Sequence, residues 1–156
     1  MEWGQIIAIV GIVLSVVAPG IGSAMAVGKA GEAGAGVISE DPDKFGQILI
    51  LQALPATQGI YGLLVAFIMM TKINLLATIS PVSVVAGWQL FGAALPTIVV
   101  GPVSALIQGR TVLAGIGLVA KRPEESGKAI TLAVMVETYA VLALLASVLM
   151  VNGIAV

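Results

Sequence analysis

Hydrophobic residues dominate four long stretches of the chain, at residues 5–28, 45–71, 84–109 and 129–156. Three of these stretches contain no charged residue, and the fourth contains only Glu137. Each is at least as long as the roughly 20 residues that an α-helix needs to cross the hydrocarbon core of a bilayer. They lack the regular alternation of apolar and polar residues that marks outer-membrane β-strands. We therefore predict an all-α membrane protein with four transmembrane helices, at about 4–39, 45–72, 84–120 and 126–153.

An internal repeat relates the two halves of the chain. A shift of 81 residues, the separation of Gly20 from Gly101, aligns many positions without a gap. The pattern predicts two tandem helical hairpins, at residues 1–75 and 82–156. Because each hairpin contains two spans, the copies have parallel topology, unlike the inverted repeats of many secondary transporters. The aligned pairs include Gly11–Gly92, Ser23–Ser104, Ala24–Ala105, Gly28–Gly109, Lys29–Arg110, Gly34–Gly115, Gly36–Gly117, Pro42–Pro123, Gly46–Gly127 and Thr57–Thr138.

Small residues recur at every fourth position in the first helix of each hairpin. Gly20, Ala24 and Gly28 form one such stripe, and its equivalent in the second hairpin runs from Gly101 to Gly109. Stripes of this kind allow two helix backbones to approach closely. They fit packing within one chain or packing between copies of the chain. The parallel hairpins favour the second interpretation, a homo-oligomeric ring of copies around one axis.

Composition supports the membrane assignment and excludes several kinds of chemistry. Hydrophobic residues make up 59% of the chain, charged residues make up 10%, and the mean hydropathy is +1.12. The chain has no cysteine and no histidine, which excludes thiol chemistry, Ser-His triads and zinc sites built from these residues. The net charge of −1, without interleaved basic and aromatic residues, gives no support for binding nucleic acid.

The basic residues predict how the chain is oriented in the membrane. Six of the seven lie toward the side reached by the two short connections, near residues 40–44 and 121–125, and only Lys72 lies opposite. The positive-inside rule makes that side cytoplasmic. We therefore expect a multi-pass protein of the cell membrane, with both termini and the 72–83 loop facing outward. The six residues are Lys29, Lys44, Arg110, Lys121, Arg122 and Lys128.

Glu137 is the only charged residue between Lys128 and the C-terminus. A carboxyl group inside a bilayer is costly unless it pairs, binds an ion or stays protonated, so Glu137 is a candidate functional residue. The alternative is a neutral glutamic acid that hydrogen-bonds two helices together. Gln108 and Glu137 each lie roughly 14 residues, or about 21 Å of helix, from the turn that joins their helices. The two side chains should therefore face each other inside the membrane.

The repeat places Ala56 at the position equivalent to Glu137. Next to it, Thr57 and Gln58 bring a hydroxyl and an amide to the depth of Glu137. The proline after Leu54 has no amide hydrogen, so a carbonyl oxygen near Leu54 loses its usual donor. Such oxygens are hard ligands, and two glutamines and a threonine would be superfluous buried polar groups for a pure proton carrier. We therefore expect Na⁺ to bind at Glu137, Gln108, Thr57, Gln58 and Leu54, with H⁺ as the alternative.

Three segments resemble the K (proteolipid, c-type) subunit of V-type ATPases, in particular its sodium-translocating bacterial form. They are residues 54–62 (LPATQGIYG), 108–110 (QGR) and 135–140 (MVETYA). The likeness extends over essentially the whole chain, including the duplicated hairpin. It implies a non-catalytic subunit of a homo-oligomeric rotor ring in the membrane, turned through a central-stalk subunit by a cytoplasmic head that hydrolyses ATP.

The same resemblance implies roles for individual residues. It assigns the Na⁺ ligands to the Leu54 carbonyl and to the side chains of Thr57, Gln58, Gln108 and Glu137, and it makes Tyr61 a supporting residue that hydrogen-bonds the glutamate. A stator subunit in the membrane would supply an arginine that attracts the carboxylate and releases the ion. Two other functions stay open, namely a proton-translocating rotor of the same design and a small non-rotary transporter or channel.

Overall fold

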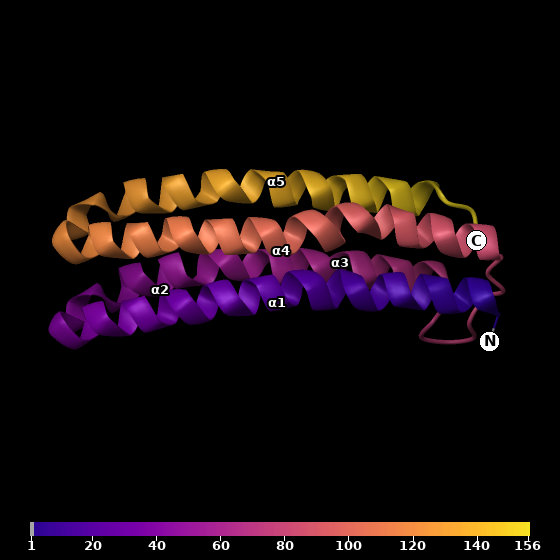
Figure 1. The fold of residues 1–156 in the computed structure, drawn as a ribbon, viewed down its shortest axis with the longest axis horizontal. Coiled ribbons are helices and arrows are strands. Elements are labelled where there is room, and N and C mark those ends of the chain that lie inside the picture. The colour runs from indigo at the N-terminus through magenta and orange to yellow at the C-terminus, as the bar shows by residue number, and fades with distance from the viewer. Residues whose placement is uncertain (1) are drawn as a thin grey trace.

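A computed structural model describes residues 2–156 as a bundle of long helices (Figure 1). Four helical segments are long and apolar enough to cross a membrane, at Trp3–Glu40, Pro42–Lys72, Val84–Lys121 and Pro123–Gly153. The expected fold class, an all-α membrane protein with four spans, is confirmed. The elements are α1 (Trp3–Glu40), η1 (Pro42–Lys44), α2 (Phe45–Ala53), η2 (Leu54–Ala56), α3 (Thr57–Lys72), α4 (Val84–Lys121), η3 (Pro123–Glu125) and α5 (Ser126–Gly153).

The second span is divided where a single helix over 45–72 was expected. Pro55 has no N–H to donate to the carbonyl of Leu51, so an α-helical hydrogen bond is missing there. The N–H of Leu54 donates to Leu51 instead, and the N–H of Thr57 donates to the carbonyl of Leu54. These shorter bonds form the 3₁₀ turn η2, which joins α2 to α3 without a change of overall direction.

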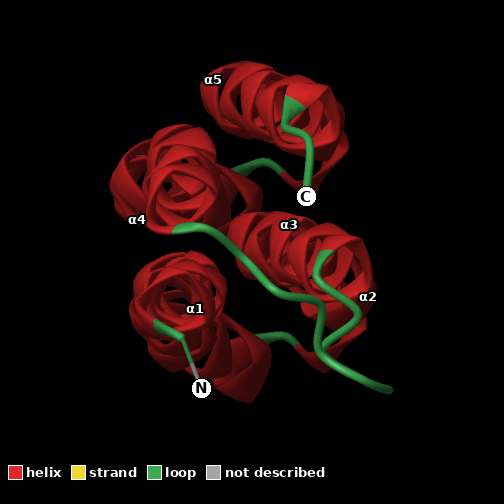
Figure 2. Cartoon of the chain, turned by 90° about the vertical axis from the view of Figure 1, so that its right-hand side faces the viewer, coloured by secondary structure: helices red, strands yellow, loops and turns green. Residues whose placement is uncertain are grey.

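Helices α1 and α4 lie side by side and form the most extensive contact in the bundle (Figure 2). Glycines permit this approach, because a Cβ atom at Gly22 would lie 2.6 Å from the Cα of Pro102. Helix α3 packs against both α1 and α4, and a Cβ atom at Gly62 would lie 2.0 Å from the carbonyl oxygen of Ser15. Helix α5 packs mainly against α4. The first helices of the two hairpins therefore form one layer, and the second helices form the other.

The short turns of both hairpins lie at one end of the bundle, and the described termini lie at the other (Figure 1). Two side chains join the turns, because Lys44 Nζ donates to the carbonyl of Ala120 at 2.8 Å and Gln47 Nε2 donates to the carbonyl of Pro123 at 3.2 Å. At the opposite end, Lys72 Nζ donates to the carbonyl of Asn152 at 3.1 Å. The hairpins are thus connected to each other at both ends.

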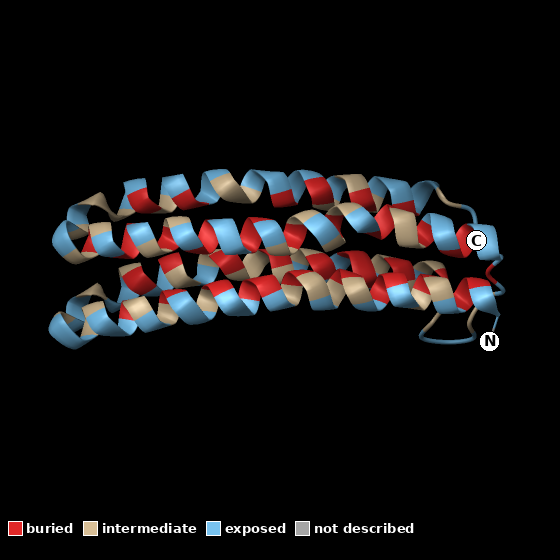
Figure 3. Cartoon of the chain, in the orientation of Figure 1, coloured by how far each residue is buried: buried red, intermediate tan, exposed pale blue. Residues whose placement is uncertain are grey.

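Buried positions recur along each helix and alternate with exposed ones (Figure 3). The buried apolar residues form two clusters, and much of the exterior is also apolar. One cluster, centred on Met69 and Leu90, packs the half near the termini. The other, centred on Leu51 and Ile116, packs the half near the turns. Large apolar side chains also project from the outside of the bundle, as expected for helices that contact lipid. Several buried polar side chains lie between the two clusters, namely Ser23, Gln58, Ser104 and Gln108.

Candidate ion-binding site

Two fully buried glutamines form the centre of the polar region. Gln58 of α3 and Gln108 of α4 are both 0% exposed, and Gln58 Nε2 donates to Gln108 Oε1 at 2.7 Å. Gln108 Nε2 donates to the carbonyl of Ala133 at 3.1 Å and to Glu137 Oε2 at 3.5 Å. Buried amides are costly without partners, and each of these amides has them. The two glutamines therefore link α3, α4 and α5 inside the bundle.

Glu137 is half-buried on α5 and accepts hydrogen bonds from two other helices. Its Oε1 accepts from the hydroxyl of Tyr61 on α3, and its Oε2 accepts from the amide of Gln108 on α4. Hydrogen bonds to a carboxyl group are stronger in a low-dielectric interior than in water. The side chain is therefore held at the junction of three helices and contacts Gln108, which helix geometry placed at the same depth.

The η2 turn supplies the remaining oxygens. The Thr57 hydroxyl donates to the Leu54 carbonyl at 3.0 Å and lies 3.3 Å from Gln58 Oε1. The Leu54 carbonyl also accepts from the N–H of Thr57 within the 3₁₀ turn, so it is not the carbonyl without a donor that was expected near Pro55. A continuous chain of hydrogen bonds results. It joins all six residues expected at the site, in the order Leu54, Thr57, Gln58, Gln108, Glu137 and Tyr61.

Three further groups border this network and were not among the expected site residues. Ser104 lies 3.5 Å from Gln58 Nε2 and donates to the carbonyl of Val136 at 3.2 Å. Ser23 accepts from the N–H of Gly59 at 3.0 Å, and the Ala133 carbonyl accepts from Gln108. The two serines are equivalent positions of the repeat, so the repeat held a signal for them. No sequence signal could have identified the Ala133 carbonyl, because every residue type has the same backbone oxygen.

The donor set has the chemistry of a site for a small hard cation of single charge. It combines one carboxylate with neutral amide, hydroxyl and carbonyl oxygens. Within residues 2–156 no group of three or more His, Cys, Asp or Glu residues is placed to hold a metal ion. Transition metals favour imidazole or thiolate, and Ca²⁺ sites usually contain several carboxylates. One carboxylate can balance one positive charge, which fits Na⁺ or a proton better than a divalent ion.

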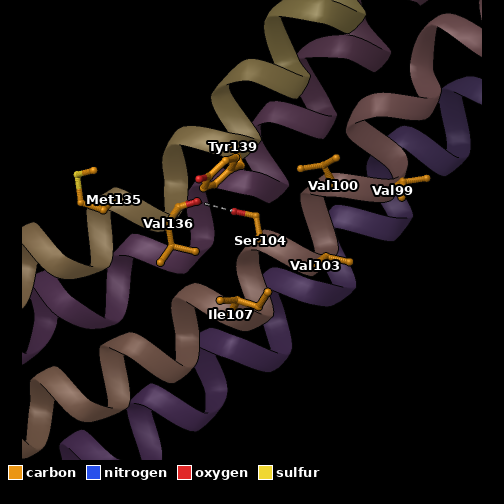
Figure 4. A pocket seen from close by; sticks show the side chains of 8 residues that line it. All are labelled: Val99, Val100, Val103, Ser104, Ile107, Met135, Val136 and Tyr139. Carbon is orange, nitrogen blue, oxygen red and sulfur yellow. Dashed lines mark hydrogen bonds between the residues drawn. The ribbon is translucent and has the colours of Figure 1, made fainter.

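A groove of about 570 Å³ runs between α4 and α5 next to the network. Apolar side chains line it, with Val100 and Ile107 from α4 and Met135 from α5 (Figure 4). In its floor, Ser104 points toward the backbone of Val136 (Figure 4). The groove opens on the side of α5 that faces away from α3, where no other described helix covers the α4–α5 seam.

The chain matches the family model for the C subunit of ATP synthase at residues 10–69 and again at 91–150. The two matches fall on the two hairpins. The chain is 43% identical to the V-type sodium ATPase subunit K of Enterococcus hirae over 95% of its own length and 92% of that protein. It is 40% identical to the A-type ATP synthase subunit K of Methanocaldococcus jannaschii over 96% of its own length and 63% of that protein.

The resemblance to K subunits of V-type ATPases is thereby confirmed, and a small non-rotary carrier finds no support. No catalytic residues were expected, and the relatives are subunits that move ions rather than hydrolyse ATP. Both hairpins agree with this assignment. The chain belongs to the family of ATP synthase C subunits, the membrane-embedded and non-catalytic ion-translocating components of ATPases and ATP synthases.

Proposed function

We propose that the chain is a rotor-ring subunit of a V-type ATPase and carries Na⁺ across the membrane on Glu137. The observation that supports this most directly is a single intramembrane carboxyl linked, through hydrogen bonds, to two buried amides, a hydroxyl and a backbone carbonyl. A proton needs only the carboxyl, whereas Na⁺ needs several oxygens around it. The similarity to a sodium ATPase subunit of Enterococcus hirae supports the same ion.

Binding of Na⁺ would exchange hydrogen bonds for ion contacts. The Gln58–Gln108 bond would give way, so that both amide oxygens turn toward the ion together with Thr57 Oγ1 and the Leu54 carbonyl. Tyr61 would keep its bond to Glu137 and hold the carboxylate in place. With the ion bound, the site is close to neutral, which lowers the cost of moving it past lipid.

Release of the ion would require a positive charge from another subunit. The arginines of this chain, Arg110 and Arg122, are both exposed, and neither is bonded to Glu137. A stator arginine that approached Glu137 would pair with the carboxylate and displace Na⁺ into an aqueous path. A new ion would then enter as rotation carried the site away, with torque delivered from the ATP-hydrolysing head by a central-stalk subunit at the turn end. We place that end in the cytoplasm of the cell, because the basic residues gather there.

The internal repeat indicates how copies of the chain would form the ring. Inside one chain, α4 contacts α1 closely, since a Cβ atom at Gly101 would lie 2.9 Å from the Cβ of Pro19. A Cβ atom at the equivalent glycine of α1, Gly20, would meet no atom within 4 Å beyond its own helix backbone. The equivalent of Pro19 is Val100, which lines the open α4–α5 groove. Helix α1 of a second copy would therefore pack into this groove between α4 and α5. The contact would repeat, between copies, the way in which α4 packs against α1 and α3 within one chain.

A contact of this type is heterologous, because one surface of the chain meets a different surface of its neighbour. Repeated with the same rotation, it closes into a ring. Tyr139 supports the same arrangement, since its side chain is 68% exposed beside the groove at the depth of the membrane. Tyrosine hydroxyls in apolar surroundings usually have a hydrogen-bond partner, which a helix of a neighbouring copy packed in the groove could supply.

Modification of Glu137 by a hydrophobic carbodiimide tests the ion. The reagent attacks a protonated carboxyl, so bound Na⁺ should slow labelling, and K⁺ at equal ionic strength should not. Glu137→Gln is the control, and it should abolish labelling in both salts. Labelling that depends on pH but ignores Na⁺ would replace the sodium proposal with a proton rotor. Ion transport by the purified chain alone, without the other subunits, would overturn the rotor proposal itself.

A further inference from the structure

The end of α5 nearest the turns has a face that no other described helix covers. A groove of about 400 Å³ runs over this face, and the residues that line it, Gly127, Lys128, Thr131 and Leu132, are all exposed. The side chain of Lys128 is 74% exposed, and its only ion pair within residues 2–156 is with Glu125, three residues before it on the same chain. This surface is separate from the candidate ion site, which lies further along α5.

The equivalent face of the first hairpin is buried within the chain. Leu51, the repeat equivalent of Leu132, is 0% exposed, whereas Leu132 is 62% exposed. Gln58 is likewise 0% exposed, and its equivalent Tyr139 is 68% exposed. The face on α2 and α3 is covered because the second hairpin packs against it, whereas α5 lies at the edge of the bundle (Figure 2). The contrast indicates that a helix from outside the chain covers the face of α5.

The contact between the two turns of one chain shows what this face would bind at its turn end. Gln47 Nε2, in the first turn of α2, donates to the carbonyl of Pro123 in η3 at 3.2 Å. The repeat equivalent of Gln47 is Lys128, and that of Pro123 is Pro42 in η1. A second copy packed against α5 as the second hairpin packs against α2 would therefore bring its η1 turn next to Lys128.

The turn of the first hairpin has the charge that Lys128 requires. It contains Glu40, Asp41 and Asp43, whereas the equivalent of Glu40 in the second hairpin is Lys121. Among residues 2–156, Asp41 pairs with Lys44, and neither Glu40 nor Asp43 takes part in an ion pair. Helix α1 also has no basic residue in its last turn, although the C-terminus of a helix favours a nearby cation. The end of α1 is therefore complementary in charge to the end of α5.

We propose that the turn end of α5 binds the acidic turn of the next copy of the chain, with Lys128 beside the carboxylates of Glu40 and Asp43. This inference rests on the ring proposed above, and it identifies an ionic contact that fixes the alignment of neighbouring copies. Leu132 is buried against α1 of the next copy, as Leu51 is buried within one chain. The contact joins hairpins of different copies at the same end of the bundle at which Gln47 joins the two hairpins of one chain.

Rings purified in a mild detergent test the proposal, with the ratio of rings to single chains measured by blue native electrophoresis over a range of salt concentrations. Lys128→Gln keeps a hydrogen-bond donor but removes the charge, so it should weaken each contact between copies roughly fivefold at low salt and abolish its salt dependence. Lys128→Glu places like charges together and should dissociate the rings further. Adding Glu40→Lys and Asp43→Lys to Lys128→Glu restores opposite charges and should restore the rings.

Lys121→Glu is the matched control, because it makes the same change of charge beside the Ala120 carbonyl that Lys44 contacts within one chain. Its rings should be as stable as those of the unmodified protein. Equal loss in this control would reduce the effect to net charge and overturn the contact. Rings that stay intact with Lys128→Glu would overturn the contact and leave the rotor proposal standing. An unmodified chain that forms no rings at any salt concentration would overturn both.

Discussion

The two hairpins share one design but contribute different chemistry to the candidate site. The first hairpin supplies Leu54, Thr57, Gln58 and Tyr61, and has Ala56 where the second has Glu137. At three of the equivalent positions the second hairpin has Met135, Tyr139 and Leu142. Several glycines occupy equivalent positions in both copies, among them Gly20 and Gly101, whereas the proposed ligands are divided between the copies. The chain therefore has one intramembrane carboxyl for two hairpins, and both hairpins contribute side chains to the same candidate site.

The largest effect should come from moving the carboxyl between the hairpins. Glu137→Gln removes the only charged ligand and should lower Na⁺ affinity by about ten- to a hundredfold and stop ion pumping by the assembled complex. Ala56→Glu combined with Glu137→Gln should not restore binding, because the residues equivalent to the ligands are largely apolar in the second hairpin. Sodium-dependent ATP hydrolysis and ²²Na⁺ uptake measure both. Restored uptake in the double variant would mean that the hairpins are interchangeable.

The equivalent glycines Gly20 and Gly101 should have different roles, one in contacts between copies and the other in the stability of the single chain. Gly101→Leu would force a side chain into Pro19 and should cost about 1–3 kcal/mol of bundle stability by overpacking. Gly20→Leu meets open space within one chain and should leave its stability nearly unchanged while it blocks ring assembly. Thermal unfolding in detergent and blue native electrophoresis separate the two effects. A ring that assembles normally with Gly20→Leu would exclude this face of α1 from the contact between copies.

The cysteine-free chain allows the same contact to be tested by cross-linking. Ile21 and Val103, both exposed, are the repeat equivalents of Pro102 and Gly22, which touch within one chain. Ile21→Cys with Val103→Cys should give a ladder of disulfide-linked copies on oxidation. Neither single variant should dimerise, because a heterologous contact does not bring identical residues together. Dimers from a single variant would indicate a two-fold contact instead.

The two tyrosines of the chain form a matched pair for a smaller effect. Tyr61→Phe removes the hydroxyl that bonds Glu137 and should weaken Na⁺ binding by about 1 kcal/mol, or roughly fivefold. Tyr139→Phe alters a groove residue outside the hydrogen-bonded network and should leave Na⁺ affinity unchanged. The sodium concentration that half-protects Glu137 from carbodiimide measures both. Equal weakening by the two variants would remove Tyr61 from its supporting role.

The smallest expected effect concerns a hydroxyl pair found only in the second hairpin. Thr97 of α4 donates to Ser147 of α5 at 2.9 Å, and both side chains are buried. The first hairpin has Val16 and Ala66 at these positions. Thr97→Val alone should cost about 0.6 kcal/mol, the usual value of such bonds in membranes. Thr97→Val with Ser147→Ala, which reproduces the first hairpin, should be closer to neutral in thermal unfolding. A larger loss in the double variant would show that the pair has another role.

Much of the fold and of the candidate site could be predicted from the sequence. Hydropathy gave the four spans, because the bilayer sets the length of an apolar helix. Counting from the turn gave the pairing of Gln108 with Glu137, because helical rise fixes depth. The close packing of α1 on α4 could not be predicted in the same way. That packing depends on which side of each helix faces which neighbour. Because α1 and α4 have glycines at equivalent positions, the sequence alone does not say which of them pack inside the chain and which face another copy.

The links between the two turns bear on how the molecule takes up mechanical load. Helices α1 and α4 have 38 residues each, so they rise about 57 Å, far more than a hydrocarbon core of roughly 30 Å. The helices therefore extend beyond the hydrocarbon core, and at the turn end Lys44 and Gln47 link one hairpin to the other. A lateral force applied to one turn would be transmitted to the other hairpin through these two hydrogen bonds. The two hydrogen bonds thus couple the turns of the two hairpins whose side chains meet in the Glu137 network.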